Sequence, residues 1–581
     1  MKKGVFLLAF AAISVSTSAY AFQMPLSINE SVVIKENDLR MLGSNFEWEE
    51  QFEAFINSDL SVNVSLAEAA GQYPLPGSRM AGSSSRVFQW KKAVGPYGDR
   101  PLQNNGYANV RMRYGVLEWI NHVKTVNPDA MLTYVLNMET GTASDAADLA
   151  EFLLGDGSVN YNGFTNWAEK RKQYGVEEPV HIDIWELGNE VDMATALGPT
   201  GMSKEEYVNS AKAYISAIKA IDPDAVFAAC GHTLTGSLDD GESQKAQEWN
   251  QYVLEQLGSS IDYLTVHLYY TQYDMTDREN KYMDKLRDMV NEICPSVKLY
   301  YSEHSTYIRD FSDPEVVERT HGMYGTLATS EFYNRVMIRP EVGAANYHCY
   351  YSPNWSEFYK DAGGILKPTP IALMMKIYAD YSIGNVVSST LTGYKEGREV
   401  GVTDLVIEQD GMLNIIITNQ TADSVEIMFE TQKNYIMTER SEIYADMTVS
   451  DPEYADNWYD KDLGIEKNEV LYNKDTYARN EICSNFEVKP YSVTAVRLKS
   501  AEPKKSTIYV ARYAEDGTLI GLRVIPDYLF TTDTRAITDA ALRYGEKAYV
   551  WDDDMKPLAI PLSVDMIVNG KDNDFADIWD N

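Results

Sequence analysis

The sequence is poor in cysteine and in basic residues, and both shortages limit what the protein can do. Its four cysteines, Cys230, Cys294, Cys349 and Cys483, are far apart and form no Cys-x-x-Cys pair, so neither a zinc knuckle nor a dense disulfide framework is predicted. Only 51 basic residues stand against 86 acidic ones, giving a net charge of −35. This charge would repel nucleic acid and anionic membranes, which leaves neutral molecules as the expected partners.

Long apolar runs are confined to the first residues. Lys2 and Lys3 precede GVFLLAFAAISV, and Ala19-Tyr20-Ala21 follows, an order typical of a secretory signal over residues 1–21. We therefore expect a secreted protein, extracellular or, in a source with an outer membrane, periplasmic. No later run approaches the roughly 18 apolar residues that span a bilayer, so no membrane insertion is expected. Nothing in the sequence indicates the oligomeric state.

The pattern of apolar residues divides the remaining chain into three parts. Between residues 22 and 380, short apolar runs alternate with longer amphipathic stretches, as in a (β/α)₈ barrel, an α/β fold with a parallel sheet. Residues 381–500 change to short alternating strands and predict an antiparallel β-sandwich, to which residues 22–40 are a candidate additional strand. Residues 501–581 predict a further small β-rich unit.

Six barrel strands can be marked directly, and two are placed by inference. The six are MLTYVLN (131–137), VHIDIWEL (180–187), AVFAACG (225–231), IDYLTVHLY (261–269), VKLYYSE (297–303) and VGAANYHCY (342–350). The first two strands are expected near Leu42–Glu47 and Leu60–Val64. A helix is expected over residues 203–221.

Two glutamates stand where an active site would form on such a barrel. Glu190 follows the strand-like IDIWEL, and Glu303 closes the later run VKLYYS. The carboxyl ends of the strands of a (β/α)₈ barrel build its active face. Hydrolysis of a glycoside with retention needs two carboxyl groups about 5–5.5 Å apart, one as acid/base and one as nucleophile. The spacing of Glu190 and Glu303 fits strands four and seven, so the two are the candidate pair.

The ordered motifs resemble the clan A glycoside hydrolases and look most like the family 51 α-L-arabinofuranosidases. The similarity is carried by VGPYGDRP (94–101), TNWAEKRKQYGVEEPVHIDIWELGNEVD (165–192), DPDAVFAACG (222–231), IDYLTVHLYY (261–270) and YSEHSTY (301–307). It implies an eight-stranded barrel with a β-sandwich packed beside it, and double displacement through a glycosyl-enzyme. Plant or algal polysaccharides or oligosaccharides would be the substrates, and no cofactor is implied, since glycine-rich phosphate loops and nicotinamide fingerprints are absent from the sequence.

The resemblance also implies roles for single residues. Glu190 matches the acid/base, Glu303 the nucleophile and Asn189 the residue that hydrogen-bonds the sugar 2-hydroxyl, while Tyr269 or Tyr270 matches the tyrosine near the nucleophile. Further expected substrate-binding residues are Glu47 in GSNFE, Asn137 at the end of the third strand, His267, His304 and, as a stacking platform, Trp355 in YYSPNWSEF.

The sequence departs from the family in the expected sugar pocket. Where the family has an arginine before a Pro-Gly-Gly-Asn turn, this chain reads Pro74-Leu-Pro-Gly-Ser-Arg79, so we expect the sugar-binding arginine and asparagine to be missing. His304 replaces the tryptophan that usually follows the nucleophile. Another sugar or endo action therefore remains an alternative, as does a non-catalytic carbohydrate-binding protein. A metal site formed by His267, His304 and His348 is disfavoured, because no His-carboxylate spacing accompanies these histidines.

Overall fold

The fold is described here from a computed structural model. The described residues are 22–564, without 49, 107, 195–200, 233–240, 271–279, 309–319, 321, 362, 393–400, 446–458, 461–464, 467–469, 478–481, 502–503, 515–516, 531–535, 538 and 559–560. The expected signal, residues 1–21, lies outside them. Among the described helices, none has both the length and the apolar character needed to cross a membrane.

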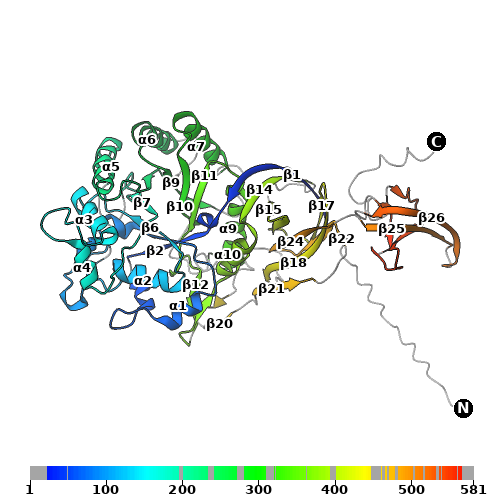
Figure 1. The fold of residues 1–581 in the computed structure, drawn as a ribbon, viewed down its shortest axis with the longest axis horizontal. Helices are drawn as coiled ribbons and strands as arrows, with labels where there is room; N and C mark the ends of the chain where they lie inside the picture. The colour runs from blue at the N-terminus through cyan, green and yellow to red at the C-terminus, as the bar shows by residue number, and fades with distance from the viewer. Residues whose placement is uncertain are drawn as a thin grey trace, which may run out of the picture.

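The predicted (β/α)₈ barrel is confirmed. Eight parallel strands close into a ring in the order β10-β11-β2-β3-β6-β7-β8-β9. They are β2 (Gly43–Glu47), β3 (Gly77–Ala81), β6 (Met131–Val135), β7 (Ile184–Leu187), β8 (Phe227–Cys230), β9 (Tyr263–Tyr270), β10 (Lys298–Thr306) and β11 (Val342–Tyr347). The surrounding helices are α1 (Val64–Ala70), α2 (Val116–Val126), α3 (Ala143–Leu154), α4 (Trp167–Gln173), α5 (Lys204–Lys219), α6 (Gly241–Leu257), α7 (Asn280–Ile293), α9 (Met323–Val336) and α10 (Pro370–Tyr381), as Figure 1 shows.

One of the eight predicted strands is wrong. Residues Leu60–Val64 do not form the second strand, because Asn63 caps α1 by accepting a hydrogen bond from the Leu66 N–H. An asparagine in that role begins a helix and ends any extended segment before it. The second strand is instead β3, which begins directly after Pro76.

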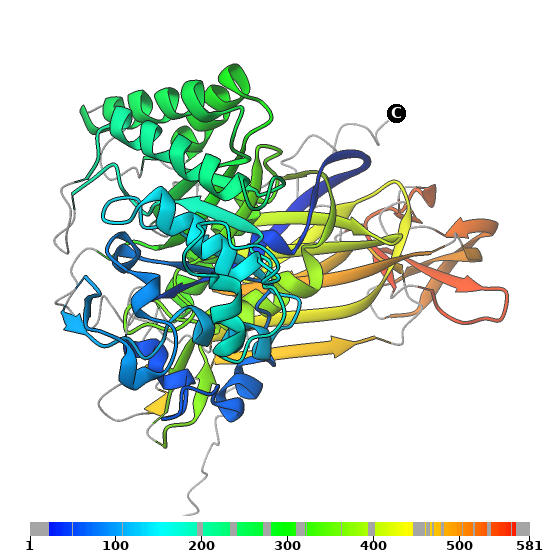
Figure 2. The ribbon, with the colours of Figure 1, turned by 60° about the vertical axis from the view of Figure 1, so that its left-hand side comes forward.

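The sandwich packs against two helices of the barrel. Its strands are β1 (Phe22–Asn37), β14 (Gly384–Leu391), β15 (Val402–Gln409), β16 (Met412–Asn419), β17 (Val425–Glu430), β18 (Asn434–Ala445), β21 (Val470–Thr476), β22 (Ile482–Cys483), β23 (Asn485–Val488) and β24 (Ser492–Ala501). They form one ten-stranded sheet around an apolar core of its own. All neighbours are antiparallel except β1 and β17. Figure 2 shows the sheet beside the barrel.

Buried polar contacts join the barrel to the sandwich. Ser330 on α9 lies 2.5 Å from the Thr418 hydroxyl on β16, and Asn334 donates to the same hydroxyl at 3.1 Å. On α10, the Tyr381 hydroxyl lies 3.0 Å from Ser441 on β18. Buried hydrogen bonds of this kind fix the orientation of the two parts, because each would leave an unsatisfied polar group if the interface slipped.

A small third unit follows the sandwich and lies at the far end of the molecule from the barrel (Figure 1). It is a four-stranded sheet in the order β26-β25-β27-β28, made of β25 (Lys504–Tyr513), β26 (Leu519–Phe530), β27 (Glu546–Asp552) and β28 (Leu562–Ser563). Short two-stranded pairs elsewhere are β4 (Gln103–Asn104) with β5 (Asn109–Val110), β12 (Phe358–Lys360) with β13 (Leu366–Pro368), and β19 (Tyr459–Asp460) with β20 (Ile465–Glu466).

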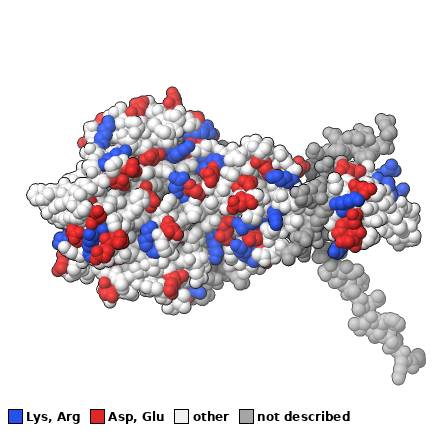
Figure 3. Space-filling model, viewed as in Figure 1, with Lys and Arg blue, Asp and Glu red and all other residues white. Residues whose placement is uncertain are grey.

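The cysteines form no disulfide, and charges of both signs are spread over the surface. All four cysteines lie in the described part of the chain, and none of them forms a disulfide. Acidic and basic side chains are interspersed over the face of the barrel and sandwich shown in Figure 3. The described parts of the fold are therefore joined by apolar packing and hydrogen bonds and not by disulfides.

A carboxyl group is buried in the barrel core and creates a pH dependence of stability. Glu357 is fully buried and accepts a hydrogen bond from Ser44 at 2.5 Å. Burial raises its pKa from 4.5 to about 8, against the opposing effect of Ser44. The folded protein thus holds a proton that the unfolded chain loses between these two pH values, so the free energy of unfolding should fall as the pH rises from 4.5 to about 8.

We expect Glu357→Gln to remove this pH dependence. The amide keeps the shape of the protonated acid and carries no charge at any pH, so the variant should gain stability relative to the wild type as the pH rises to 8. Urea unfolding at pH 5 and pH 8.5 measures the difference. The exposed Glu68→Gln is the matched control, and equal pH slopes for wild type and Glu357→Gln would contradict the prediction.

Candidate active site

The two candidate catalytic glutamates meet at the carboxyl ends of the barrel strands. Glu190 follows β7 and Glu303 lies in β10. One oxygen of each carboxylate and one nitrogen of His267 all lie within 4.8 Å of one another. Both carboxylates are largely buried, with 12% of the Glu190 side chain and 8% of the Glu303 side chain exposed. Two carboxyl groups at this separation match the short distance of a retaining pair.

Glu190 is held by a strained turn. Gly188 has a φ of 90° and Glu190 a φ of 47°, a left-handed conformation that costs a non-glycine residue roughly 1–2 kcal/mol. The Nδ1 atom of His267 on β9 lies 2.9 Å from Oε1 of Glu190. Strain of this kind is stored at functional sites, where the surrounding structure enforces one side-chain position.

A buried ion pair between Arg86 and Glu139 supports the segment that carries Glu190. Arg86 is buried and forms an ion pair with Glu139, just after β6. Its Nη2 atom also donates to the carbonyl oxygen of Met193 at 2.9 Å. Arg86 therefore ties the loop after β6 to the loop after β7, three residues beyond Glu190.

Glu303 is surrounded by donors and positive charge. The Tyr269 hydroxyl donates to its Oε1, and Nη1 of Arg79 donates to its Oε2 at 3.2 Å. Burial would raise the pKa of Glu303, but His267, followed by His348, Arg79 and Tyr269, lowers it well below the usual range. Glu303 is thus held ionised, which is the state that a nucleophile requires.

Arg79 on β3 links both sides of the site. It is completely buried and donates through Nε and Nη2 to Glu186 on β7, each at 2.7 Å. Its Nη2 also donates to Oδ1 of Asn189 at 2.9 Å. Burial would lower the pKa of Arg79, but the carboxylates of Glu186 and then Glu303 raise it. Arg79 is therefore a fixed cation that positions Asn189 and Glu303 together.

Arg79 is a buried arginine at the site, in the segment where we expect the family's sugar-binding arginine to be missing. The segment Pro74–Arg79 stands where the family has its Pro-Gly-Gly-Asn turn, but Arg79 lies inside β3 and points to the barrel axis, against Glu186 and Glu303. The sequence signal that could have indicated this position is the alternation of Ser78, Arg79 and Met80, which is typical of a short strand. Glu186, a charged residue inside the apolar run IDIWEL, was a second signal that we missed.

Three further predicted residues lie at the same mouth. His267 is 3% exposed, and its pKa is raised because Glu303 and Glu190 outweigh the opposing effect of burial. Glu47 ends β2 and lies 3.9 Å from Nε2 of His348. Trp355 packs its ring 5.3 Å from Tyr269 and donates to the Thr306 carbonyl at 2.7 Å. Trp355 is 8% exposed, so it forms part of the wall of the site.

Tyr270 and His304 do not reach the mouth, contrary to our prediction. Each follows an inward-facing residue by one position and so faces the helices, since neighbouring residues of a strand point to opposite sides. The Tyr270 hydroxyl donates to Thr329 on α9 at 2.9 Å, and the His304 ring stacks 4.1 Å from Phe332. Burial lowers the pKa of His304 well below its ordinary value, so this histidine is an uncharged core residue.

Asn137 is also a structural residue instead of a substrate ligand. Its Nδ2 donates to the Phe88 carbonyl at 3.1 Å and to the Thr140 hydroxyl at 2.8 Å. Its Oδ1 accepts from the N–H groups of Thr140 and Gly141. The side chain closes the turn after β6, and these bonds use both ends of its amide.

The cluster Glu190, His267 and Glu303 also has the composition of a metal-binding set. The guanidinium of Arg79, 3.2 Å from Glu303, would repel a cation at that position. The Tyr269 hydroxyl also occupies the other oxygen of Glu303. The surroundings therefore fit an ionised, hydrogen-bonded carboxylate better than a metal ligand.

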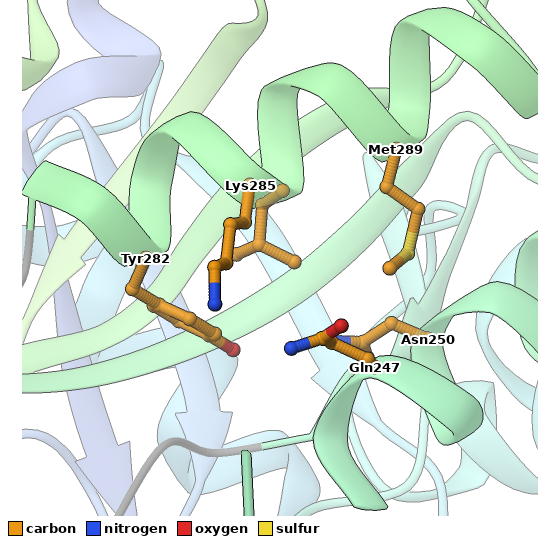
Figure 4. A pocket seen from close by; sticks show the side chains of 6 residues that line it. Gln247, Asn250, Tyr282, Lys285 and Met289 are labelled. Atoms are coloured by element: carbon orange, nitrogen blue, oxygen red, sulfur yellow. The ribbon is translucent and has the colours of Figure 1, made fainter. Parts of the chain in front are cut away.

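A separate small pocket lies outside the barrel, between α6 and α7 (Figure 4). It is lined by Gln247, Asn250, Tyr282, Lys285, Leu286 and Met289. None of these described lining residues is a carboxylate, so they offer none of the acid, base or nucleophile chemistry assembled at the strand ends.

We expect Tyr269→Phe to slow the reaction more than it weakens binding. A hydrogen bond to a charged group contributes about 1.5–3 kcal/mol, so losing it from Glu303, the candidate nucleophile, should lower kcat by roughly 10- to 150-fold. KM should change little, because the hydroxyl donates to Glu303. Tyr270→Phe is the matched control, because the Tyr270 hydroxyl hydrogen-bonds to Thr329 on α9 and does not reach the mouth of the barrel. A larger loss of kcat for that variant would contradict the assignment.

The relatives of this chain agree with the geometry. The model for the family described as "Alpha-L-arabinofuranosidase 1 domain" matches residues 73–288, which include Glu190 but not Glu303. An intracellular exo-α-(1→5)-L-arabinofuranosidase of Streptomyces lividans is 30% identical over 212 residues, covering 36% of this chain and 29% of the relative. The enzyme of the same description from Acetivibrio thermocellus is 30% identical over 218 residues, covering 36% and 40%. The chain thus spans less than half the length of these curated relatives.

The solved structures extend the likeness to the whole fold of the barrel and sandwich. A family 51 α-L-arabinofuranosidase from Bifidobacterium longum superposes with a TM-score of 0.67 over 82% of this chain and 99% of that chain, at 15% identity. An identity this low shows the fold alone. Together, the family match, the curated relatives and the shared fold show that this chain resembles the family 51 α-L-arabinofuranosidases within the clan A glycoside hydrolases.

Proposed function

We propose that the protein is a retaining glycoside hydrolase with α-L-arabinofuranosidase-like activity. The observation that carries the proposal is the pair of carboxylates within 4.8 Å, one of which is held ionised by Arg79 and Tyr269. The natural substrate is a plant or algal polysaccharide, or an oligosaccharide released from one.

The reaction proceeds by double displacement. Ionised Glu303 attacks the anomeric carbon while Glu190 donates a proton to the departing glycosidic oxygen. Formation of the glycosyl-enzyme consumes the carboxylate of Glu303, and Glu190, which has given up its proton to the leaving group, then accepts a proton from the attacking water. The water displaces Glu303, and the product keeps the original anomeric configuration.

The polar neighbours position the sugar. Asn189 is 2% exposed, and Arg79 fixes its amide oxygen, so its amide N–H groups are directed for a sugar hydroxyl. His267 contacts the acid/base, and Glu47 at the end of β2 supplies a further acceptor at the mouth. Preorganised groups of this kind raise the rate because they do not need to reorganise during the reaction.

Export of the protein is part of the proposal. It is supported by the basic, apolar and small-residue order of residues 1–21. The curated relatives from Streptomyces lividans and Acetivibrio thermocellus are described as intracellular, so export would distinguish this chain from them. Detection of protein lacking residues 1–21 outside the cytoplasm of the source cells tests it.

The activity is tested with a panel of chromogenic glycosides and neutral polysaccharides. We expect release of the chromophore from the α-L-arabinofuranoside above all other sugars. Cleavage of a different glycoside would leave the proposed mechanism standing and change the proposed sugar specificity. Failure of every substrate, with folded protein, would favour a non-catalytic carbohydrate-binding role.

A further inference from the structure

The sheet of the third unit has one buried face and one open face. Ile508, Val510 and Val550 point inward and are at most 2% exposed, within the apolar core of the unit. Because neighbouring residues of a strand alternate, the residues between them point outward. The unit that carries this sheet lies at the end of the molecule opposite the barrel (Figures 1 and 2).

Four aromatic rings gather on the open face. The register of β25 and β27 places Tyr509 opposite Tyr549 and Thr507 opposite Trp551. The rings of Tyr509 and Trp551 lie 5.4 Å apart, and the hydroxyls of Tyr513 and Tyr549 lie 3.0 Å apart. The contacts between strands hold the rings in place, so little side-chain entropy remains to be lost when a ligand binds.

The neighbouring strand extends this surface with aliphatic side chains. Leu522 and Val524 on β26 lie opposite Ala511 and Tyr509, and they are 57% and 47% exposed. The residues from Thr507 to Tyr513 and their partners on β27 are all described. Among those that point to the open face, Lys547 is the one charged residue. We call Tyr509, Tyr513, Tyr549, Trp551, Leu522 and Val524 the ring face.

We propose that the ring face binds a neutral polysaccharide chain and holds the enzyme on its substrate. This inference rests on the proposed glycosidase function, because it takes the bound molecule to belong to the same class as the substrate. An exposed apolar patch of this kind marks a binding surface. Tyrosine and tryptophan combine an apolar ring with a polar edge, and a sugar ring likewise has C–H faces and hydroxyl edges.

Charge favours a neutral glycan over other partners. The chain carries a net charge of −35, which repels polyanions, and the ring face offers a single lysine to bind one. A second copy of the chain would carry the same charge. Pairing of β26 with another strand edge is also interrupted by Pro526 and by Asp527, whose φ is 54°.

Affinity electrophoresis of the full chain through native gels that contain arabinan or arabinoxylan tests the proposal. The Glu303→Ala background prevents hydrolysis during the run. We expect both neutral glycans to retard the protein and polygalacturonate to have no effect. Trp551→Ala with Tyr549→Ala should weaken the retardation by roughly tenfold or more, because two aromatic contacts are lost.

Two further variants make the result decisive. Leu522→Asp places a charge on the ring face without touching the core and should weaken retardation as well. Tyr544→Ala removes a tyrosine of the same unit that is 87% exposed and lies outside the sheet, and it should migrate as its parent does. Unchanged retardation in both ring-face variants, no retardation of the parent, or self-association that the ring-face substitutions abolish would overturn the proposal.

Hydrolysis of a small chromogenic glycoside separates this inference from the proposed function. In the active chain, Trp551→Ala should leave that hydrolysis unchanged, because a small substrate reaches only the barrel. Loss of hydrolysis in this variant would place Trp551 in the catalytic machinery and contradict a separate surface. A wild type that hydrolyses the glycoside but shows no retardation would reject the ring face alone.

Discussion

Replacement of Glu303 by alanine should lower kcat by about 10⁴-fold or more, since the variant loses the group that forms the covalent intermediate in the proposed mechanism. Two donors and two histidines hold this carboxylate ionised. No other described carboxylate occupies the same position and could replace it. Turnover of an activated aryl glycoside measures the loss.

External azide should restore part of the activity of Glu303→Ala and yield a glycosyl azide of inverted configuration. The small anion fits the space left by the carboxylate and attacks directly, in a single displacement. Glu341→Gln is a suitable control, because Glu341 is also buried but precedes β11 at the opposite end of the barrel. Turnover near that of the wild type in Glu303→Ala would remove Glu303 from the mechanism.

Replacement of Arg79 by methionine should lower the free energy of unfolding by about 3–5 kcal/mol, because it leaves the fully buried Glu186 without its partner. Activity should fall as well, since Asn189 and Glu303 lose a shared donor. Urea unfolding followed by tryptophan fluorescence measures the first effect. Arg113→Met, which breaks a partly exposed pair with Glu53, should cost less than about 1 kcal/mol.

A double variant separates charge from packing at this site. Arg79→Met combined with Glu186→Leu removes both charges of the buried pair and should recover much of the lost stability. Activity should stay low, because Glu303 still lacks the guanidinium. A double variant no more stable than Arg79→Met would show that lost packing, and not the uncompensated charge, causes the destabilisation.

Local patterns in the sequence predicted most of the barrel. Strands such as β9 and β11 are short, mainly apolar runs with valine, leucine, alanine or aromatic residues at neighbouring positions, which is typical of strands buried on both faces. The placement of Glu190 and Glu303 at strand ends followed from the same runs. Strand β3 was missed because its five residues, GSRMA, contain a glycine, a serine and an arginine, and nothing local reveals that the arginine meets two carboxylates.

The direction of each side chain was harder to predict than the strand itself. In β10, a register irregularity lies between Tyr300 and Glu303, and both Ser302 and Glu303 face the barrel axis while His304 faces α9. A strict alternation cannot locate such an irregularity in advance. For Asn137, the sequence could not distinguish a ligand from a turn-closing amide, because its partners come from residues 88 and 140–141.

The identity of the nucleophile is the central claim, and labelling of the enzyme tests it most directly. A 2-deoxy-2-fluoro glycoside with a good leaving group slows the second displacement, so the glycosyl-enzyme accumulates and can be digested for mass spectrometry. We predict a single added sugar on the peptide that contains Glu303, and none in Glu303→Ala. Label on a different residue, or hydrolysis that releases the inverted sugar with no labelled peptide, would contradict the double-displacement mechanism through Glu303.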